Sequence, residues 1–575
     1  MQELHNLALE LQKDDSDDEL DDRLQRSRKS EFARAVALFD NSFSAYIQLK
    51  PPGILPYHPG FLDVVFVGFT AFSMLWGAAG HPEGAALVPL LRNLSPHMLK
   101  WSAVAHPARR RLARGHQRDI QSDVINVSQV YLAILESNAE NTKAFLHAHP
   151  DLLAQVLEMW VNFTQYATLP GKTDDIGGRA AYVIATAACH LYEILADERK
   201  SPSEDDLALF LDALRDARIT KRFLWNAIGP QTRTLCDLYL DPVIALSTWK
   251  NHIEWLTGLI QLPDFAPSRI PREVVASAVA AADFCLDKRE NLAACIVLRY
   301  IAIICEVARD NRPLVQAIEE GVFDIIYDLD SVSERVDATR LVMCLCKGLV
   351  HARVLRAFRK KLDFMPPSEV DQPKENTRTW RTVMLTYMVH QNLYNDHSKR
   401  RSWRFSMACS NSSGEGPHTE HVRLCACGEA FYCSGSCQRM AWDRVHRYEC
   451  CAAAGPWGLQ GAISIVDVAF FYCVVRAHIM SVKATIGGWI SNYFEQCKKE
   501  PRPLEGLTII CDYAQVMPNP HHSVIARALD MKRHVNDHHI IRGHVSAEAI
   551  FYIGRTKVQR KMPFSYPMSY FCPSL

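Results

Sequence analysis

One segment of this 575-residue chain, residues 409–451, concentrates residues that bind metal ions. Its cysteines are Cys409, Cys425, Cys427, Cys433, Cys437, Cys450 and Cys451. Thiolates and imidazoles are the ligands that Zn²⁺ prefers in closed tetrahedral sites, and such sites stabilise domains too small to fold on their own core. The segment therefore predicts a structural zinc module, which limits what this part of the chain can fold into.

The spacing within the segment is as informative as its composition. Cys433 and Cys437 are followed by Gln438 and Trp442, and then His446 and Cys450 stand four residues apart. A pair at that spacing projects from one face of a short helix, so both side chains can reach one ion. The pattern from Phe431 to Cys450 resembles the second half of the MYND zinc finger, a cross-braced two-zinc module known chiefly for binding proline-containing peptides.

The resemblance implies two Zn²⁺ ions and assigns ligands to each. It gives one ion the ligands Cys425, Cys427, His446 and Cys450, and it gives the other ion Cys409, Cys433 and Cys437. Two departures matter. The pair Cys425 and Cys427 is one residue closer than in the family, and Ser412 stands where the family has a cysteine. Because imidazole replaces thiolate in Cys3His sites, His421 or His418 is expected to complete the incomplete site, and we favour His421. The alternative is that this site is degenerate and binds metal weakly.

The resemblance also implies a peptide-binding groove formed with the help of Gln438 and Trp442. Proline-rich segments bind aromatic-lined grooves at low entropic cost because they are already extended. The alternative is that Trp442 is simply the small hydrophobic core of the finger.

Composition and charge limit the rest of the chain. Lysine plus arginine equals aspartate plus glutamate at 64 each, so no overall positive field attracts nucleic acid or an anionic membrane. The N-terminus turns acidic where a secretory signal needs its hydrophobic region. Of 18 cysteines, eleven lie outside residues 409–451, in apolar surroundings typical of reduced core residues. We expect a cytoplasmic or nuclear protein without a membrane span.

The chain is expected to be mainly α. Apolar residues recur at three- and four-residue steps between 31 and 358, which predicts an irregular helical array or an armadillo-like solenoid. The predicted order of segments is an acidic disordered lead-in at 1–30, the helical domain at 31–358, a linker at 359–378, a helical lead to the finger at 379–408, the finger at 409–450, and an α+β tail at 451–575. Short strands are predicted at 507–511, 540–545 and 549–553.

These features favour an intracellular, non-catalytic scaffold that binds a proline-containing segment of a partner protein through a zinc-dependent finger. Lysine methyltransferases that carry MYND fingers are an alternative, but they need an Asn-His-Ser-Cys stretch and a glycine-rich cofactor segment that this sequence lacks. A transcription-associated nucleic-acid-binding protein is a further alternative. It is disfavoured because the finger helix mixes acidic and basic residues.

Overall fold

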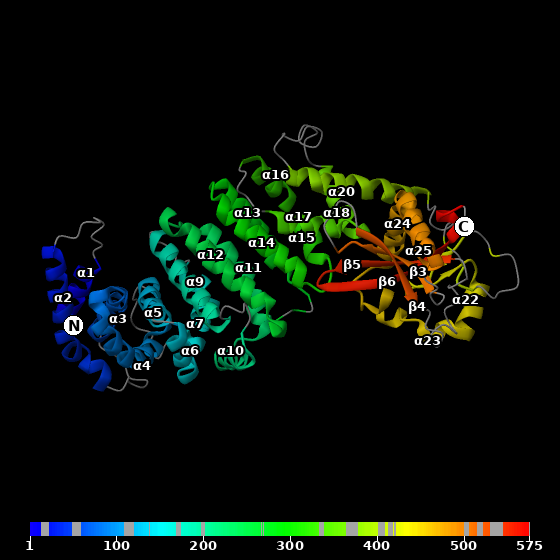
Figure 1. Cartoon of the computed structure of the whole chain (residues 1–575). Helices are drawn as coiled ribbons and strands as arrows, with labels where there is room; N and C mark the ends of the chain where they lie inside the picture. The colour runs from blue at the N-terminus through cyan, green and yellow to red at the C-terminus, as the bar shows by residue number, and fades with distance from the viewer. Residues whose placement is uncertain are drawn as a thin grey trace. The chain divides into compact units, whose positions relative to one another are not determined.

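In the computed structural model the chain forms two compact units. Figure 1 shows the helices and strands in their order along the chain. The first comprises Met1–Ala266 and Asp287–Val297, and the second comprises Pro267–Leu286 and Leu298–Leu575. The residues that the structure describes are 1–12, 22–48, 59–107, 120–136, 139–167, 174–196, 202–265, 267, 269–332, 338–363, 378–400, 407, 409–411, 418, 421–499, 505–514, 521–528 and 544–573.

The described part of the first unit is built from helices. They are α1 (Gln2–Leu11), α2 (Asp22–Gln48), α3 (Pro59–Ala79), η1 (Pro82–Ala86), α4 (Leu87–Ala105), α5 (Ile120–Leu135), α6 (Ala139–Ala148), α7 (Asp151–Val161), α8 (Phe163–Ala167), α9 (Asp174–Ala196), α10 (Glu204–Asp216), α11 (Lys221–Asp237), α12 (Pro242–Gln261) and η3 (Pro263–Phe265). Side-chain caps mark several starts, since Ser203 accepts a hydrogen bond from the Asp206 amide and Thr220 from the Phe223 amide. Tryptophans Trp160 and Trp255 meet edge to face in the core, with ring centroids 5.4 Å apart.

The second unit begins with further helices and continues into the finger and the tail. Its helices before the finger are α13 (Arg272–Asp287), α14 (Asn291–Val307), α15 (Arg312–Glu319), α16 (Val322–Val332), α17 (Thr339–Gly348), α18 (Ala352–Leu362), α20 (Arg378–Asn395) and the π-helical turn η4 (Asp396–Arg400), with the ends of α13 and α14 divided between the units. Gly321 separates α15 from α16 with a φ of 99°, a conformation that favours glycine. Phe323 stacks on the buried Trp380, with centroids 4.0 Å apart, which joins α16 to α20.

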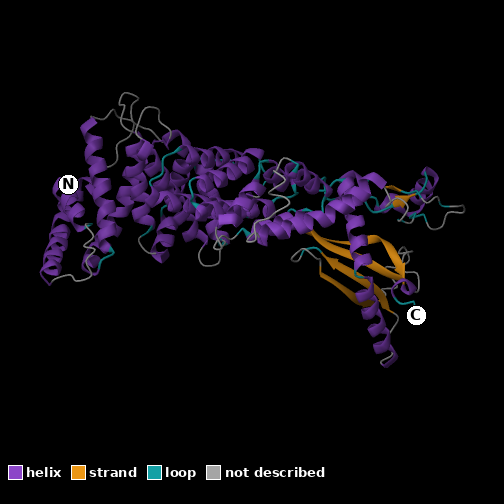
Figure 2. Cartoon of the chain, turned by 90° about the horizontal axis from the view of Figure 1, so that it is seen from above, coloured by secondary structure: helices purple, strands orange, loops and turns teal. Residues whose placement is uncertain are grey.

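The tail combines helices with one mixed sheet (Figure 2). Its elements are α24 (Ile465–Ser481), α25 (Lys483–Lys499), β3 (Glu505–Asp512), β4 (His521–Ala528), β5 (His544–Ile553), β6 (Thr556–Pro567) and α26 (Met568–Phe571). The strand order is β4-β3-β5-β6, with β3 and β5 parallel and the other two pairings antiparallel. Residues of β5 alternate between buried and half-buried, as expected of a strand with one face on a core. Phe471 of α24 packs on Phe551 of β5, with centroids 4.1 Å apart.

The mainly α fold predicted from the sequence is confirmed, and several local expectations differ from the structure. Residues 2–11, expected to belong to a disordered lead-in, form α1, whose leucines Leu4, Leu7 and Leu11 are buried. Helix α18 runs through residue 358 to Leu362, and most of the predicted linker, residues 364–377, lies outside the described residues. Strands β4 and β6 were not predicted, and residues 540–543 of the predicted strand at 540–545 lie outside the described residues. The armadillo-like interpretation stays a prediction.

Among the described helices, none alone is both long and apolar enough to cross a membrane. Helices α24 and α25, bent by 68° relative to each other, meet the length and composition criteria only when taken together.

Candidate metal centre

A short hairpin and a short helix position the predicted ligands. Strands β1 (Arg423–Leu424) and β2 (Phe431–Tyr432) pair antiparallel, and Cys425 and Cys427 lie in the turn between them. Gly428 follows with a φ of 82°, which lets the chain reverse. The helical segment comprises α22 (Gly435–Ala441), the π-helical turn η5 (Trp442–His446) and α23 (Arg447–Glu449). Ser434 caps α22 by accepting a hydrogen bond from the Cys437 amide, so Cys433 and Cys437 flank the helix start.

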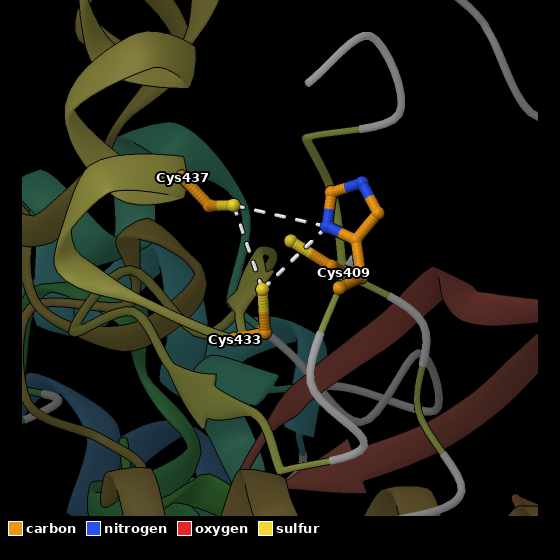
Figure 3. Close-up of side chains that lie close together, drawn as sticks. Cys409, Cys433 and Cys437 are labelled. Atoms are coloured by element: carbon orange, nitrogen blue, oxygen red, sulfur yellow. Dashed lines mark hydrogen bonds between the residues drawn. The ribbon is translucent and has the colours of Figure 1, made fainter. Parts of the chain in front are cut away.

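The first ligand cluster consists of Cys409, His418, Cys433 and Cys437. The Cys433 and Cys437 sulfurs lie 3.4 Å apart, and Nδ1 of His418 lies 3.5 Å from the first and 3.7 Å from the second. Figure 3 shows the three labelled cysteines turned toward one imidazole ring. All four ligand atoms lie within 4.8 Å of one another.

The histidine in the first cluster corrects our preference for His421. The structure places His418 against the three cysteines, and His421 is not a member of the cluster. The physical reason is position along the chain. His421 lies only two residues before β1 (Arg423–Leu424), whereas His418 lies three residues farther from the hairpin and has more chain with which to reach the three cysteines. Ser412, the position of the missing cysteine, lies outside the described residues.

The second ligand cluster consists of Cys425, Cys427, His446 and Cys450. Nε2 of His446 lies 3.3 Å from the Cys425 sulfur and 3.6 Å from the Cys427 sulfur. The Cys450 amide donates to the His446 carbonyl at 2.8 Å, which holds these two ligands one turn apart. Cys425, Cys427 and His446 are buried, and Cys450 is half-buried.

Both clusters have the dimensions of a zinc site. A tetrahedral Zn²⁺ ion with bonds of about 2.3 Å to sulfur and about 2.0 Å to nitrogen holds two sulfurs roughly 3.8 Å apart and a sulfur and a nitrogen roughly 3.5 Å apart. The sulfur–nitrogen separations in the two clusters, 3.3 to 3.7 Å, agree with this geometry to within about 0.2 Å, and the sulfurs of Cys433 and Cys437, 3.4 Å apart, lie somewhat closer than a bound ion would hold them. Each cluster offers three thiols and one imidazole, a donor set that structural zinc sites use. The residues present therefore fit zinc at both positions.

Burial shifts the pKa values of three of these ligands in the metal-free finger. Burial raises the pKa of the Cys409 thiol to about 11 and, reinforced by the neighbouring Cys425, raises the pKa of Cys427 above its usual 9.0. Burial also lowers the pKa of His446 below 6.5, which keeps its imidazole neutral. The metal-free Cys409 and Cys427 thiols are therefore protonated at neutral pH, and a zinc ion that binds them must displace those protons.

The sequence match agrees with this geometry. Residues 408–450 match the family model described as MYND finger. This segment is a MYND finger. Comparison of the chain with curated proteins and with solved structures returned no match. MYND fingers bind zinc and are generally protein-interaction modules, so the finger implies zinc binding here.

The MYND finger presents both residues of the predicted peptide groove. Gln438 is exposed on α22, and Trp442, four residues later, is 43% exposed. The Trp442 ring meets the ring of the ligand His446 at a centroid distance of 5.9 Å. The buried core of the finger is formed instead by Tyr432 with Ala430 and the ligand cysteines. Trp442 is therefore not the core of the finger.

Contacts between the finger and the tail were not predicted. The Trp457 amide donates to the Cys427 carbonyl at 2.7 Å, and its indole Nε1 donates to the Gly428 carbonyl at 3.2 Å. The Tyr472 hydroxyl of α24 donates to the same Gly428 carbonyl at 2.5 Å. Arg560 of β6 pairs with Glu429 at 3.3 Å. The only sequence signal was an isolated tryptophan among glycines, in Gly455-Pro-Trp-Gly458, which does not reveal its partners.

A further group in the first unit has metal-ligand atoms in reach of one another. Cys189 of α9 lies 3.8 Å from a carboxylate oxygen of Glu193 and 3.9 Å from one of Glu254. Burial, helped by these two carboxylates, raises the pKa of the Cys189 thiol well above its usual value. This thiol stays protonated at neutral pH, and both glutamates are exposed, so the group lacks the closed ligand shell of the two finger clusters.

Proposed function

We propose that the protein is a zinc-dependent, non-catalytic interaction scaffold whose finger binds a proline-containing segment of a partner protein. The observation that carries the proposal is the exposure of Trp442, 43%, beside a finger core that is already filled by Tyr432. The finger core does not include this large aromatic side chain, and its ring is accessible to solvent. It is therefore available to contact a ligand.

The chemistry of the two groove residues suits such a ligand. Gln438 and Trp442 are four residues apart, so their side chains project from neighbouring positions of the finger helix. An indole face packs on proline rings, and a glutamine amide both donates to and accepts from peptide groups that an extended segment leaves unpaired. The π-helical turn η5 begins at Trp442, and such turns occur frequently at functional sites.

The proposal places the protein in the cytoplasm or the nucleus. All 18 cysteines are free thiols, including those outside the two ligand clusters, which supports a reducing compartment. The ligand clusters are closed sets of three thiols and one imidazole, without a position left for substrate. This supports a structural rather than a catalytic role for the metal.

The test uses an array of proline-containing peptides and matched proline-to-alanine peptides, probed with the full-length chain. Gln438→Ala and Trp442→Ala are expected to lose the proline-dependent signal while zinc content, measured by mass spectrometry, stays at the wild-type value. Gln496→Ala is the matched control, because Gln496 is an exposed glutamine on α25. Proline-dependent binding that survives both groove substitutions would contradict the proposal.

A further inference from the structure

Helix α18 carries a solvent face made only of cations, which we name the basic face. It consists of Arg353, Arg356, Arg359 and Lys360, all exposed. The opposite side of α18 is buried, with Phe358 packed on Tyr387 of α20 at a ring-centroid distance of 5.0 Å. The spacing of the four residues along the helix places them side by side along its exposed side.

Within the described residues, these four cations lack the ion pairs that several other cations of the second unit form. Ion pairs join Arg272 to Glu320, Arg312 to Asp310, Arg340 to Glu306, Lys361 to Asp324 and Arg560 to Glu429. None of the four residues of the basic face has an ion pair within the described part of the chain. Arg356 Nε only reaches the carbonyl of Ala352 in its own helix, at 3.3 Å.

Folding does not account for this arrangement. Like charges three or four residues apart on a helix repel each other, and the basic face contains several such pairs, among them Arg353 with Arg356 and Arg356 with Lys360. Arg353 also lies in the first turn of α18, where the helix dipole disfavours a positive charge. The nearby carboxylate of Asp467 accepts the backbone amide of Arg353 at 2.9 Å and the Ser464 hydroxyl, so it caps helices rather than neutralising the face.

We propose that the basic face of α18 is a docking surface for an acidic peptide segment of a partner protein. Three of its four cations are arginines, whose planar guanidinium binds a carboxylate through two parallel hydrogen bonds. The face spans eight residues from Arg353 to Lys360, about 10 Å along the helix, which matches roughly three residues of an extended peptide.

Charge complementarity selects a peptide over a nucleic acid. Nucleic-acid binding relies on a broad positive field that neutralises many phosphates, whereas this chain has a formal net charge of zero and the basic face has four cations. A short acidic segment is neutralised by four cations without such a field. This surface lies on α18, outside the finger, so the inference is independent of the proposed peptide groove at Gln438 and Trp442.

The test measures binding of a fluorescently labelled peptide of alternating Glu and Ser to the full-length chain by anisotropy, with a Gln/Ser peptide of equal length as the uncharged probe. The triple variant Arg353→Gln, Arg356→Gln, Arg359→Gln is expected to bind the acidic peptide at least about tenfold more weakly. Its Tm is expected to be unchanged or higher, because the substitutions remove repulsion without touching the core. Arg340→Gln is the control, since Arg340 is already paired with Glu306, and it should bind like the wild type.

Equal affinity of wild type and triple variant would overturn the proposal, as would an equal loss in Arg340→Gln. A lower Tm in the triple variant would assign the cations a structural role instead. Two further outcomes would identify a different occupant and overturn the peptide assignment. The first is that single-stranded RNA or phosphatidylserine vesicles bind these residues more tightly than the acidic peptide does. The second is that the chain self-associates and the triple variant abolishes this self-association.

Discussion

The two ligand clusters of the MYND finger share a donor set but differ in their surroundings. In the first cluster His418 is exposed, Cys409 and Cys433 are half-buried, and only Cys437 of the four is buried. In the second, Cys425, Cys427 and His446 are buried, and the turn that carries the two cysteines is hydrogen-bonded to Trp457 and α24. The second cluster is therefore part of the C-terminal body, whereas the first is a surface feature. The finger is therefore not an independent zinc module, because its second cluster is hydrogen-bonded to the C-terminal tail.

The largest effect is expected from removing a ligand of the second cluster. Cys427→Ala should unfold the finger, because structural zinc contributes about 10–16 kcal/mol to the folding of small zinc modules. Because the Cys427 carbonyl also accepts from the Trp457 amide, loss of order should extend into residues 455–475. Hydrogen exchange followed by mass spectrometry is expected to show lost protection at 422–450 and at 455–475, and unchanged protection in the first unit.

Cys497→Ala is the matched control for this substitution, since Cys497 is a half-buried cysteine of α25 outside both clusters. It should leave the exchange pattern of the finger unchanged. Full protection of residues 455–475 in Cys427→Ala would show that the tail does not depend on the second cluster.

A smaller effect is expected from substituting Trp457, the tail residue that is hydrogen-bonded to the cysteine turn of the second cluster. Trp457→Ala removes a buried indole that packs on Tyr472 and Phe551, and should cost about 3–5 kcal/mol of the stability of the tail. Trp457→Phe keeps a ring but loses the indole hydrogen bond to Gly428, and should cost about 1–2 kcal/mol. Urea unfolding followed by hydrogen exchange of tail peptides measures both. Equal stability of the two variants would contradict the role given to packing.

The smallest effect on stability is expected at the first cluster. His418→Ala should reduce zinc content from two ions toward one, because it removes the single imidazole of this cluster, while the second cluster keeps its ion. His421→Ala is the control, and it should leave zinc content unchanged. Metal analysis by mass spectrometry decides between the two histidines. A wild-type chain that holds one ion, or a loss in His421→Ala alone, would contradict the assignment.

The structure brings together the predicted ligand residues that have fixed spacing, and it differs from the prediction where the path of a loop decides. Cys433, Cys437, His446 and Cys450 lie on or beside one helical segment, so their separation in sequence fixes their separation in space. The choice between His418 and His421 depends on the path of the chain after Cys409, which spacing does not determine.

The fold was predictable to a similar extent. Most helices could be predicted from their apolar periodicity. Helix α1 was not predicted, although its leucines at positions 4, 7 and 11 have helical spacing, because the acidic residues that follow it indicated disorder. Strand β6 was missed because its sequence, Thr-Lys-Val-Gln-Arg-Lys-Met-Pro-Phe-Ser-Tyr-Pro, carries charges and prolines, which are tolerated at the edge of a sheet. Its pairing partner β5 directly precedes it across the turn at Gly554 and Arg555, so the pairing is local and the charged, proline-containing sequence is what conceals the strand.

The turn between β5 and β6 forms hydrogen bonds with residues that lie more than 240 positions earlier in the sequence. The Gly554 amide donates to Asn311 Oδ1 at 3.0 Å across 243 residues, and the Arg555 amide donates to the Ala308 carbonyl at 2.6 Å. At a synthesis rate of about 5–20 residues per second, roughly 12–50 s pass between the emergence of Asn311 and that of its partner. The finger, which ends at Cys450, is complete in the chain for the last part of that time, about 5–20 s before Gly554 emerges. The order of synthesis therefore allows zinc to be captured before the unit that holds the finger has closed.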